Sequence, residues 1–127
     1  MNLLLDTHAL LWWFDGSSRL SRRALRAIES QSNSVVVSAV SAWEIAIKSA
    51  GGKLDAGPLL AGFRTEIEQE GFSELPISFE HAVRAGLLPG PHHDPFDRML
   101  IAQAQLENLA IVSRDDSFDR YSVRRIW

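Results

Sequence analysis

Short apolar segments alternate along the chain with longer stretches in which apolar residues recur at helical spacing. The short segments are rich in leucine and β-branched residues, which is typical of strands that are buried on both faces of a sheet. We expect strands at 2–5, 35–38, 73–77, 109–113 and 122–126. We expect helices at 7–14, 21–31, 42–50, 58–70, 78–87 and 95–107.

Several of these predicted helices have recognisable end signals. Ser21 is suited to cap the second helix, and Gly51 with Gly52 is suited to end the third. Asp94 followed by Pro95 is a strong N-cap and first-turn pair for the last helix. These signals support the predicted alternation of strands and helices.

Strands that alternate with helices of this length are typical of βαβ units. We therefore predict an α/β fold, a three-layer α/β/α sandwich around a central parallel sheet. Residues 1–127 are expected to form a single domain, with neither internal repeats nor low-complexity tracts. In such sheets the ligand site lies beyond the carboxyl ends of the strands.

Four acidic residues occupy positions near those strand ends. Asp6 directly follows the first predicted strand, and Asp115 follows the fourth. Glu44 lies on the first turn of the helix after the second strand, and Asp97 lies on the first turn of the helix before the fourth. We expect the four carboxylates to approach one another at one edge of the sheet.

Each of these acids also has a purely structural interpretation. Asp6 is suited to cap the helix that begins at Thr7, and Ser41 with Glu44 has the spacing of a capping box. Asp97 is favoured in a first turn by the helix dipole, and Asp115 is an ordinary turn residue. One residue at a time, the sequence leaves both interpretations open.

Together, four carboxylates at one sheet edge would repel one another unless a cation lay among them. Ligands that are all oxygen favour Mg²⁺ or Mn²⁺ over zinc. Such ions activate water and stabilise the oxygens of a displacement at phosphorus. The set of acids therefore predicts hydrolysis of a phosphodiester.

The composition changes this picture in two ways. The chain has no cysteine, which excludes disulfides, thiolate zinc sites and a cysteine nucleophile. Its net charge of -3 argues at first sight against a nucleic-acid partner. Setting aside the four acids assigned to metal leaves 13 basic and 12 acidic residues, so the objection is removed.

No membrane or export signal is apparent in the sequence. The longest apolar run, 9–14, is far shorter than the roughly 20 residues that span a bilayer. The N-terminal segment has no basic region before its leucines. We expect a cytoplasmic protein that does not enter a membrane.

Four segments spread over nearly the whole chain match the motifs of a known family, in that family's order and spacing. They are 3–12 (LLLDTHALLW), 38–45 (SAVSAWEI), 93–104 (HDPFDRMLIAQA) and 111–115 (IVSRD). The chain thereby resembles the PIN-domain ribonucleases, and in particular the VapC toxins of bacterial type II toxin–antitoxin pairs.

The resemblance implies a catalytic and metal-binding quartet of Asp6, Glu44, Asp97 and Asp115. Thr7 and Ser113 would be its hydroxyl neighbours and contact the substrate. The adjacent Asp116 leaves the fourth ligand open, and Asp115 is preferred for its spacing to Ser113. The resemblance further implies an endoribonuclease that cleaves tRNA or ribosomal RNA with Mg²⁺ or Mn²⁺. It also implies a homodimer, and a VapB-type antitoxin whose C-terminal tail occupies a groove near the site.

Several residues near the quartet are candidates for binding substrate or partner. Arg98 and Arg114 each adjoin a proposed ligand and are suited to contact phosphate. Lys48 lies four residues after Glu44, where it either pairs with that residue or meets an RNA phosphate. Three tryptophans and two histidines complete the candidates. Trp12, Trp13 and Trp43 are expected to be mostly core, with an exposed share forming a partner groove. His92 and His93 either approach the substrate or, as we favour, are loop residues without a chemical role.

Three other functions fit an acidic α/β domain less well. A receiver-like signalling module needs paired acids after the first strand and a lysine after the last, whereas Asp6 stands alone and Arg124 is the nearest cation. A phosphatase with an aspartyl nucleophile needs a second aspartate two residues later, where the chain has His8. A domain that only binds would not need the complete quartet.

Overall fold

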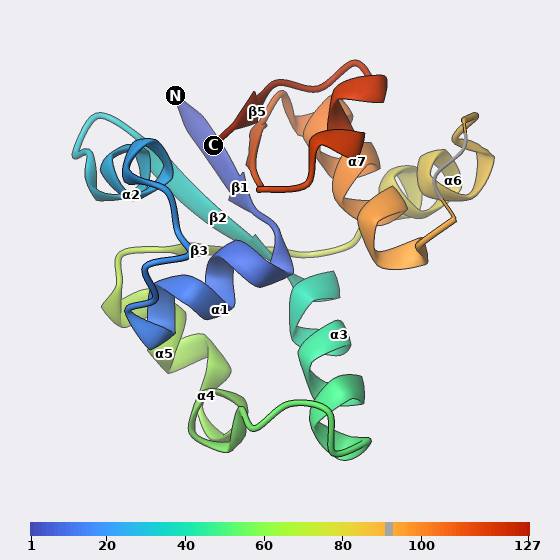
Figure 1. Cartoon of the computed structure of the whole chain (residues 1–127). Helices are drawn as coiled ribbons and strands as arrows, with labels where there is room; N and C mark the ends of the chain where they lie inside the picture. The colour runs from blue at the N-terminus through green and yellow to red at the C-terminus, as the bar shows by residue number, and fades with distance from the viewer. Residues whose placement is uncertain (91–92) are drawn as a thin grey trace.

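In the computed structural model, which describes residues 1–90 and 93–127, five strands form one parallel sheet in the order β3-β2-β1-β4-β5 (Figure 1). The strands are β1 (Asn2–Leu5), β2 (Ser34–Ser38), β3 (Ser73–Leu75), β4 (Ala110–Val112) and β5 (Arg125–Ile126). The α/β fold with a central parallel sheet is therefore confirmed.

Helices cover both faces of this sheet. Within the described residues they are α1 (Thr7–Asp15), α2 (Arg22–Glu29), α3 (Ala39–Ala50), α4 (Gly57–Ala61), α5 (Phe63–Gln69), α6 (Phe79–Leu87), α7 (Pro95–Glu107) and the 3₁₀ helix η1 (Asp116–Arg120). None of these helices is long and apolar enough to cross a membrane.

The central strand β1 supplies both layers of the core. Leu3 and Leu5 point into a cluster with residues of α1, α2, α4 and α5, while Leu4 points into a second cluster with Leu100 and Ile101 of α7. All three leucines are fully buried, because successive side chains of a strand face opposite sides of the sheet. The predicted sandwich of three layers follows from this alternation.

The strand order reverses between β1 and β4, which are adjacent in the sheet. The chain runs from β1 outward to β2 and β3, then returns to β4 and β5 on the other side. Such a reversal opens a crevice at the carboxyl ends of the two strands. Asp6 lies at this point, and its backbone N–H donates to the carbonyl of Val112 at the end of β4 (3.1 Å).

Helix α3 begins three residues earlier than the predicted 42–50. Its N-cap is Ser38, whose hydroxyl accepts from the N–H of Val40 (3.0 Å), so the capping box between Ser41 and Glu44 was a wrong interpretation. Because β2 passes directly into the helix, Glu44 lies in the second turn and not in the first. Its side chain is therefore available for other contacts.

The remaining differences concern short or divided elements. The predicted helix 58–70 is two helices that meet at Gly62, whose non-helical backbone (φ −145°, ψ 48°) interrupts the helical pattern. Strands β3, β4 and β5 are each shorter than predicted, and β3 and β5 are the two edge strands of the sheet. The 3₁₀ helix after β4 was not predicted.

Candidate active site

Asp6 is at once the N-cap of α1 and a buried carboxylate at the sheet edge. Its Oδ1 accepts from the N–H of Ala9 (2.8 Å), and the Ser113 hydroxyl also hydrogen-bonds to it. Burial raises the pKa of Asp6 above its ordinary value, and the neighbouring Asp115 raises it further, although these hydrogen bonds and His8 oppose the rise. A cation bound here would stabilise the ionised carboxylate, so the helix cap is also suited to bind metal.

Asp115 lies beside Asp6, across the reversal of strand order. It caps η1 through its Oδ1, which accepts from the N–H of Ser117 (2.9 Å). Its own N–H donates to the Ser113 hydroxyl (3.0 Å), the group that also bonds to Asp6. The buried Ser113 thus ties the two acids together from the end of β4.

The two carboxylates share a hollow of about 420 Å³ between α1 and the segment that follows β4. Its lining consists of Asp6, His8, Trp12, Arg114, Asp115 and Asp116. Both Asp115 and Asp116 are exposed and face this hollow, so the structure leaves either able to act as the fourth ligand. Among these acids Asp6 alone is buried.

Glu44 is also buried, and its carboxylate is already bound by other side chains. The Thr7 hydroxyl donates to its Oε1 (2.7 Å) and also lies 3.1 Å from the Ser41 hydroxyl. The ammonium of Lys48 is 2.5 Å from Oε2. Thr7 follows Asp6 directly, so this network joins Glu44 to the same edge of the sheet.

Asp97 is half-buried in the first turn of α7. Asp94 fixes this turn, since its Oδ1 accepts from the N–H of Phe96 (2.8 Å) and of Asp97 (3.3 Å). The rings of Phe96 and Trp43 pack edge to face with centroids 5.1 Å apart, which holds the start of α7 against α3. Asp97 therefore lies near the helix that carries Glu44.

The donors at this edge fit a magnesium or manganese ion by their chemistry. They are carboxylate and hydroxyl oxygens, the ligands that such ions prefer. Within residues 1–90 and 93–127, however, no three acidic or histidine side chains stand close enough to hold one ion between them. Mg²⁺ commonly keeps several waters and takes one or two protein carboxylates plus substrate phosphate, so this looser arrangement is compatible with it.

Two of the predicted phosphate contacts have structural roles. The guanidinium of Arg98 donates to the carbonyls of Ala85 (3.1 Å) and Leu88 (2.5 Å) at the end of α6, which gives this side chain a structural role there. Lys48 neutralises Glu44. Arg114 differs from both, because it is exposed and lines the hollow beside Asp6.

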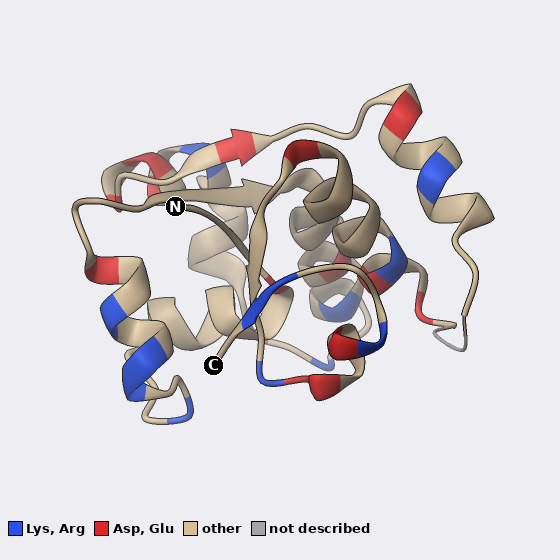
Figure 2. Cartoon of the chain, turned by 90° about the horizontal axis from the view of Figure 1, so that it is seen from above, with Lys and Arg blue, Asp and Glu red and all other residues tan. Residues whose placement is uncertain are grey.

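Charge at the surface is otherwise dispersed. Figure 2 shows basic residues on several separate elements, interleaved with acidic ones, and α2 alone carries Arg22, Arg23 and Arg26. Arg125 is paired with Asp119 through two contacts of 2.8 Å, and this pairing lowers the pKa of Asp119. Arg125 also donates to the carbonyl of Ser113 (3.2 Å), which supports the site from the side of β5.

The sequence pattern indicates no role for His8, and Trp12 is expected from it to be mostly core. In the structure both line the hollow, and their rings stack with centroids 5.7 Å apart. The sequence feature that could have indicated this pair is their spacing of four residues, which puts both rings on one helix face close to Asp6. His93 is exposed in the loop before α7, and His92 lies outside the described residues.

Comparison with known proteins gives one family and a consistent set of folds. A family model described as PIN domain matches residues 3–123. No curated protein matches the sequence.

Three of the similar solved structures illustrate the likeness in fold. That of VapBC2 from Rickettsia felis bound to promoter DNA has a TM-score of 0.72 at 15% identity, covering 98% of this chain and 97% of that one. DNA-bound VapBC from Salmonella typhimurium gives 0.68 at 18% identity, with 98% and 96% covered. A toxin–antitoxin complex from Klebsiella pneumoniae gives 0.61 at 23% identity, with 90% and 87% covered. At these identities the likeness establishes the fold.

Proposed function

Because the chain belongs to the PIN domain family, a family of nucleases, we propose that it is a metal-dependent endoribonuclease and the toxin of a toxin–antitoxin pair. The observation that carries the nuclease proposal is the pair of Asp6 and Asp115 at the reversal of strand order, joined through Ser113. The proposed substrates are structured RNAs such as tRNA or ribosomal RNA, which places the reaction in the cytoplasm.

Asp6, Glu44, Asp97 and Asp115 are the acids of the proposed site for Mg²⁺ or Mn²⁺, of which one or two would bind the ion directly and the others would act through its bound waters. When bound, the ion would supply an activated water and stabilise the charge that develops on the phosphate oxygens. The chain itself contributes the position of these acids. Asp6 is fixed by the start of α1, and Glu44 is held by Thr7 and Lys48.

The other side chains near the acids either offset the charge of the substrate or hold the acids in position. Arg114 is placed to offset the negative charge of an RNA phosphate beside the acids. Ser113 orients Asp6 and the backbone of Asp115. Thr7 keeps Glu44 turned toward the same edge. In this proposal Arg114 meets the substrate, the buried Thr7 and Ser113 position the acids, and Arg98 and Lys48 have structural roles.

The direct test is cleavage of total RNA by purified protein with Mg²⁺ or Mn²⁺, with and without a chelator. We expect Asp6→Asn to lower the rate by at least about 100-fold, the scale on which removing a group that stabilises the transition state acts. Asp15→Asn makes the same change at the exposed C-terminal end of the same helix and should retain full activity. Equal cleavage by wild type and Asp6→Asn would contradict the proposal.

An antitoxin protein is the proposed inhibitor, since the similar structures from Rickettsia felis and Salmonella typhimurium are VapBC complexes. Trp43 and Ile47 are 57% and 47% exposed at a spacing of four residues on α3. They form an apolar stripe of the kind that an amphipathic segment covers. Expression of the chain alone should arrest growth, and co-expression of a small protein encoded beside it should restore growth.

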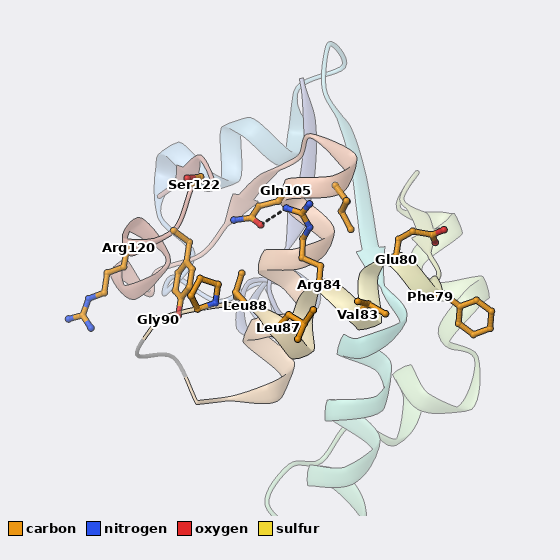
Figure 3. Close-up of a pocket in the computed structure, with 13 residues that line it drawn as sticks. Phe79, Glu80, Val83, Arg84, Leu87, Leu88, Gly90, Gln105, Arg120 and Ser122 are labelled. Atoms are coloured by element: carbon orange, nitrogen blue, oxygen red, sulfur yellow. Dashed lines mark hydrogen bonds between the residues drawn. The ribbon is translucent and has the colours of Figure 1, made fainter.

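A second copy of the chain is the proposed occupant of the outer face of α6. Phe79, Val83 and Leu87 are exposed there at a regular spacing of four residues and border a hollow of about 1090 Å³ (Figure 3). Two such helices packed antiparallel about Val83 would place Phe79 of one copy against Leu87 of the other. Glu80 and Arg84, on the same helix, would then meet with opposite charge.

A further inference from the structure

Three aromatic rings form a row that starts at the hollow containing Asp6. His8 stacks on Trp12 with ring planes inclined by 29°, and Trp12 contacts Trp127 with centroids 5.8 Å apart. His8 is exposed, whereas Trp12 is half-buried and packs against the core beneath it. A ligand can therefore reach His8, while the core holds Trp12 in place behind it.

The position of these rings relative to the acids is fixed by α1. Asp6 is the N-cap of this helix, and His8 and Trp12 follow it on one face, four residues apart. His8 and Asp6 both line the hollow, so the imidazole ring lies near the Asp6 carboxyl. A planar group placed against His8 would thus lie next to the carboxylates.

Three kinds of functional group line the hollow. It has carboxylates for a metal ion, the Arg114 guanidinium for a phosphate, and the two aromatic side chains His8 and Trp12. Proteins that recognise unpaired RNA stack its bases on aromatic side chains and on arginine planes. A base inside a duplex does not offer its face in this way.

On the basis of the proposed nuclease function, we propose that His8 and Trp12 form a stacking platform for an unpaired nucleobase next to the phosphate to be cleaved. The platform selects single-stranded segments, such as loops, over duplex RNA. His8 and Trp12 are positioning residues in this proposal, and the acids remain the catalytic ones. Arg114 holds the phosphate of the stacked nucleotide.

The test uses a short single-stranded RNA that carries the fluorescent base 2-aminopurine, and the same RNA annealed to its complement. Binding is measured with Ca²⁺ in place of Mg²⁺, by the quenching that stacking causes. We expect the wild type to quench the single strand and to bind it more tightly than the duplex. His8→Ala should weaken binding of the single strand by about 5- to 100-fold, the range for losing one stacked base.

His8→Phe separates stacking from the charge of the histidine. It keeps an aromatic ring but removes the ionisable imidazole near Asp6, so it should bind within about twofold of wild type if stacking carries the affinity. Trp12→Leu is a second test of the platform, and Trp13→Leu on the same helix is its control. The Trp13 side chain donates to Glu70 and packs on Phe72 away from the hollow, so only Trp12→Leu should lose quenching.

Two results would overturn the platform. One is equal binding of the single strand by wild type, His8→Ala and His8→Phe. If these changes weaken the binding of an antitoxin but not of RNA, the platform is likewise contradicted. The other is an equal loss of binding in His8→Ala and His8→Phe, which would assign the effect to the imidazole nitrogens and not to stacking on a ring. Quenching without any RNA cleavage in Mg²⁺ or Mn²⁺ would instead support the platform and contradict the nuclease proposal, so the two failures are distinguishable.

Discussion

Asp6 shows how one side chain combines a structural and a proposed chemical role. It caps α1, as the sequence allowed, and it also lies buried beside Asp115 at the hollow. The structural interpretation of an acid in a helix cap therefore does not compete with its role at a site. The cap fixes the carboxylate in the orientation that a ligand requires.

The raised pKa of Asp6 predicts how stability depends on metal and pH. For an acid whose folded-state pKa is raised, stability is lost as pH rises from the ordinary value of 3.8 through the folded-state pKa. Without metal at neutral pH, Asp6→Asn should therefore unfold at a temperature equal to or above that of wild type.

Metal should reverse that order. Mg²⁺ or Mn²⁺ at about 100 times its dissociation constant should stabilise wild type by about 2.7 kcal/mol and leave Asp6→Asn unchanged. Thermal unfolding followed by circular dichroism, with chelator and then with metal, measures both effects. An equal metal-induced shift in the two proteins would show that Asp6 is not a ligand.

Two arginines that looked equivalent in the sequence should differ on mutation. Arg98→Ala should reduce stability by about 1 to 3 kcal/mol, because the carbonyls that end α6 lose a charged donor. Arg114→Ala should leave stability unchanged and lower RNA affinity. It should also reduce the dependence of log K on log salt by about 0.7, the value for one phosphate contact on a single strand. Urea unfolding and RNA binding at several salt concentrations distinguish the two arginines. A loss of stability in Arg114→Ala, together with a loss of RNA affinity alone in Arg98→Ala, would refute both roles.

At the scale of elements, the start of each helix positions the acid that it carries. Helix α3 begins at Ala39 because Ser38 caps it, and this moves Glu44 into contact with Thr7. Helix α7 begins with Asp94 and Pro95, as predicted, and this places Asp97 in its first turn. The caps thus determine the site as much as the acids do.

Loss of the α7 cap should affect both stability and activity. Asp94→Ala removes the acceptor for the N–H groups of Phe96 and Asp97 and should cost about 1 kcal/mol. The rate should fall at saturating RNA because Asp97 is less well positioned. Asp94→Asn keeps an acceptor at the cap and is the matched control. If both variants cleave RNA at the same rate as wild type, the turn does not position Asp97.

At the scale of the whole molecule, the order of the strands brings distant parts of the sequence together. Asp6 and Asp115 are separated by nearly the full chain, yet they meet because β1 and β4 are neighbours in the sheet. Whether residues 1–127 act as one independent domain stays a prediction. The outer face of α6 is a feature of the same scale, because its exposure depends on how that helix packs on α7.

The proposed homodimer gives a prediction for this face. Val83→Asp should shift the molecular mass in solution from dimer to monomer, since the charge would be buried at the centre of the pairing. Analytical ultracentrifugation measures the mass. Leu25→Asp, a similar change at a partly exposed leucine on α2, should leave the dimer intact. A wild-type monomer, or a Val83→Asp dimer, would assign the face to another partner.

The sequence by itself determined the alternation of strands and helices and several helix starts, because hydrophobic periodicity and caps act over a few neighbouring residues. It also identified the acids near the strand ends. Only the tertiary structure decided which of these acids are buried, that Arg98 ends α6, and that His8 stacks on Trp12 beside Asp6. Those outcomes depend on packing between segments far apart in the chain, and no local pattern encodes them.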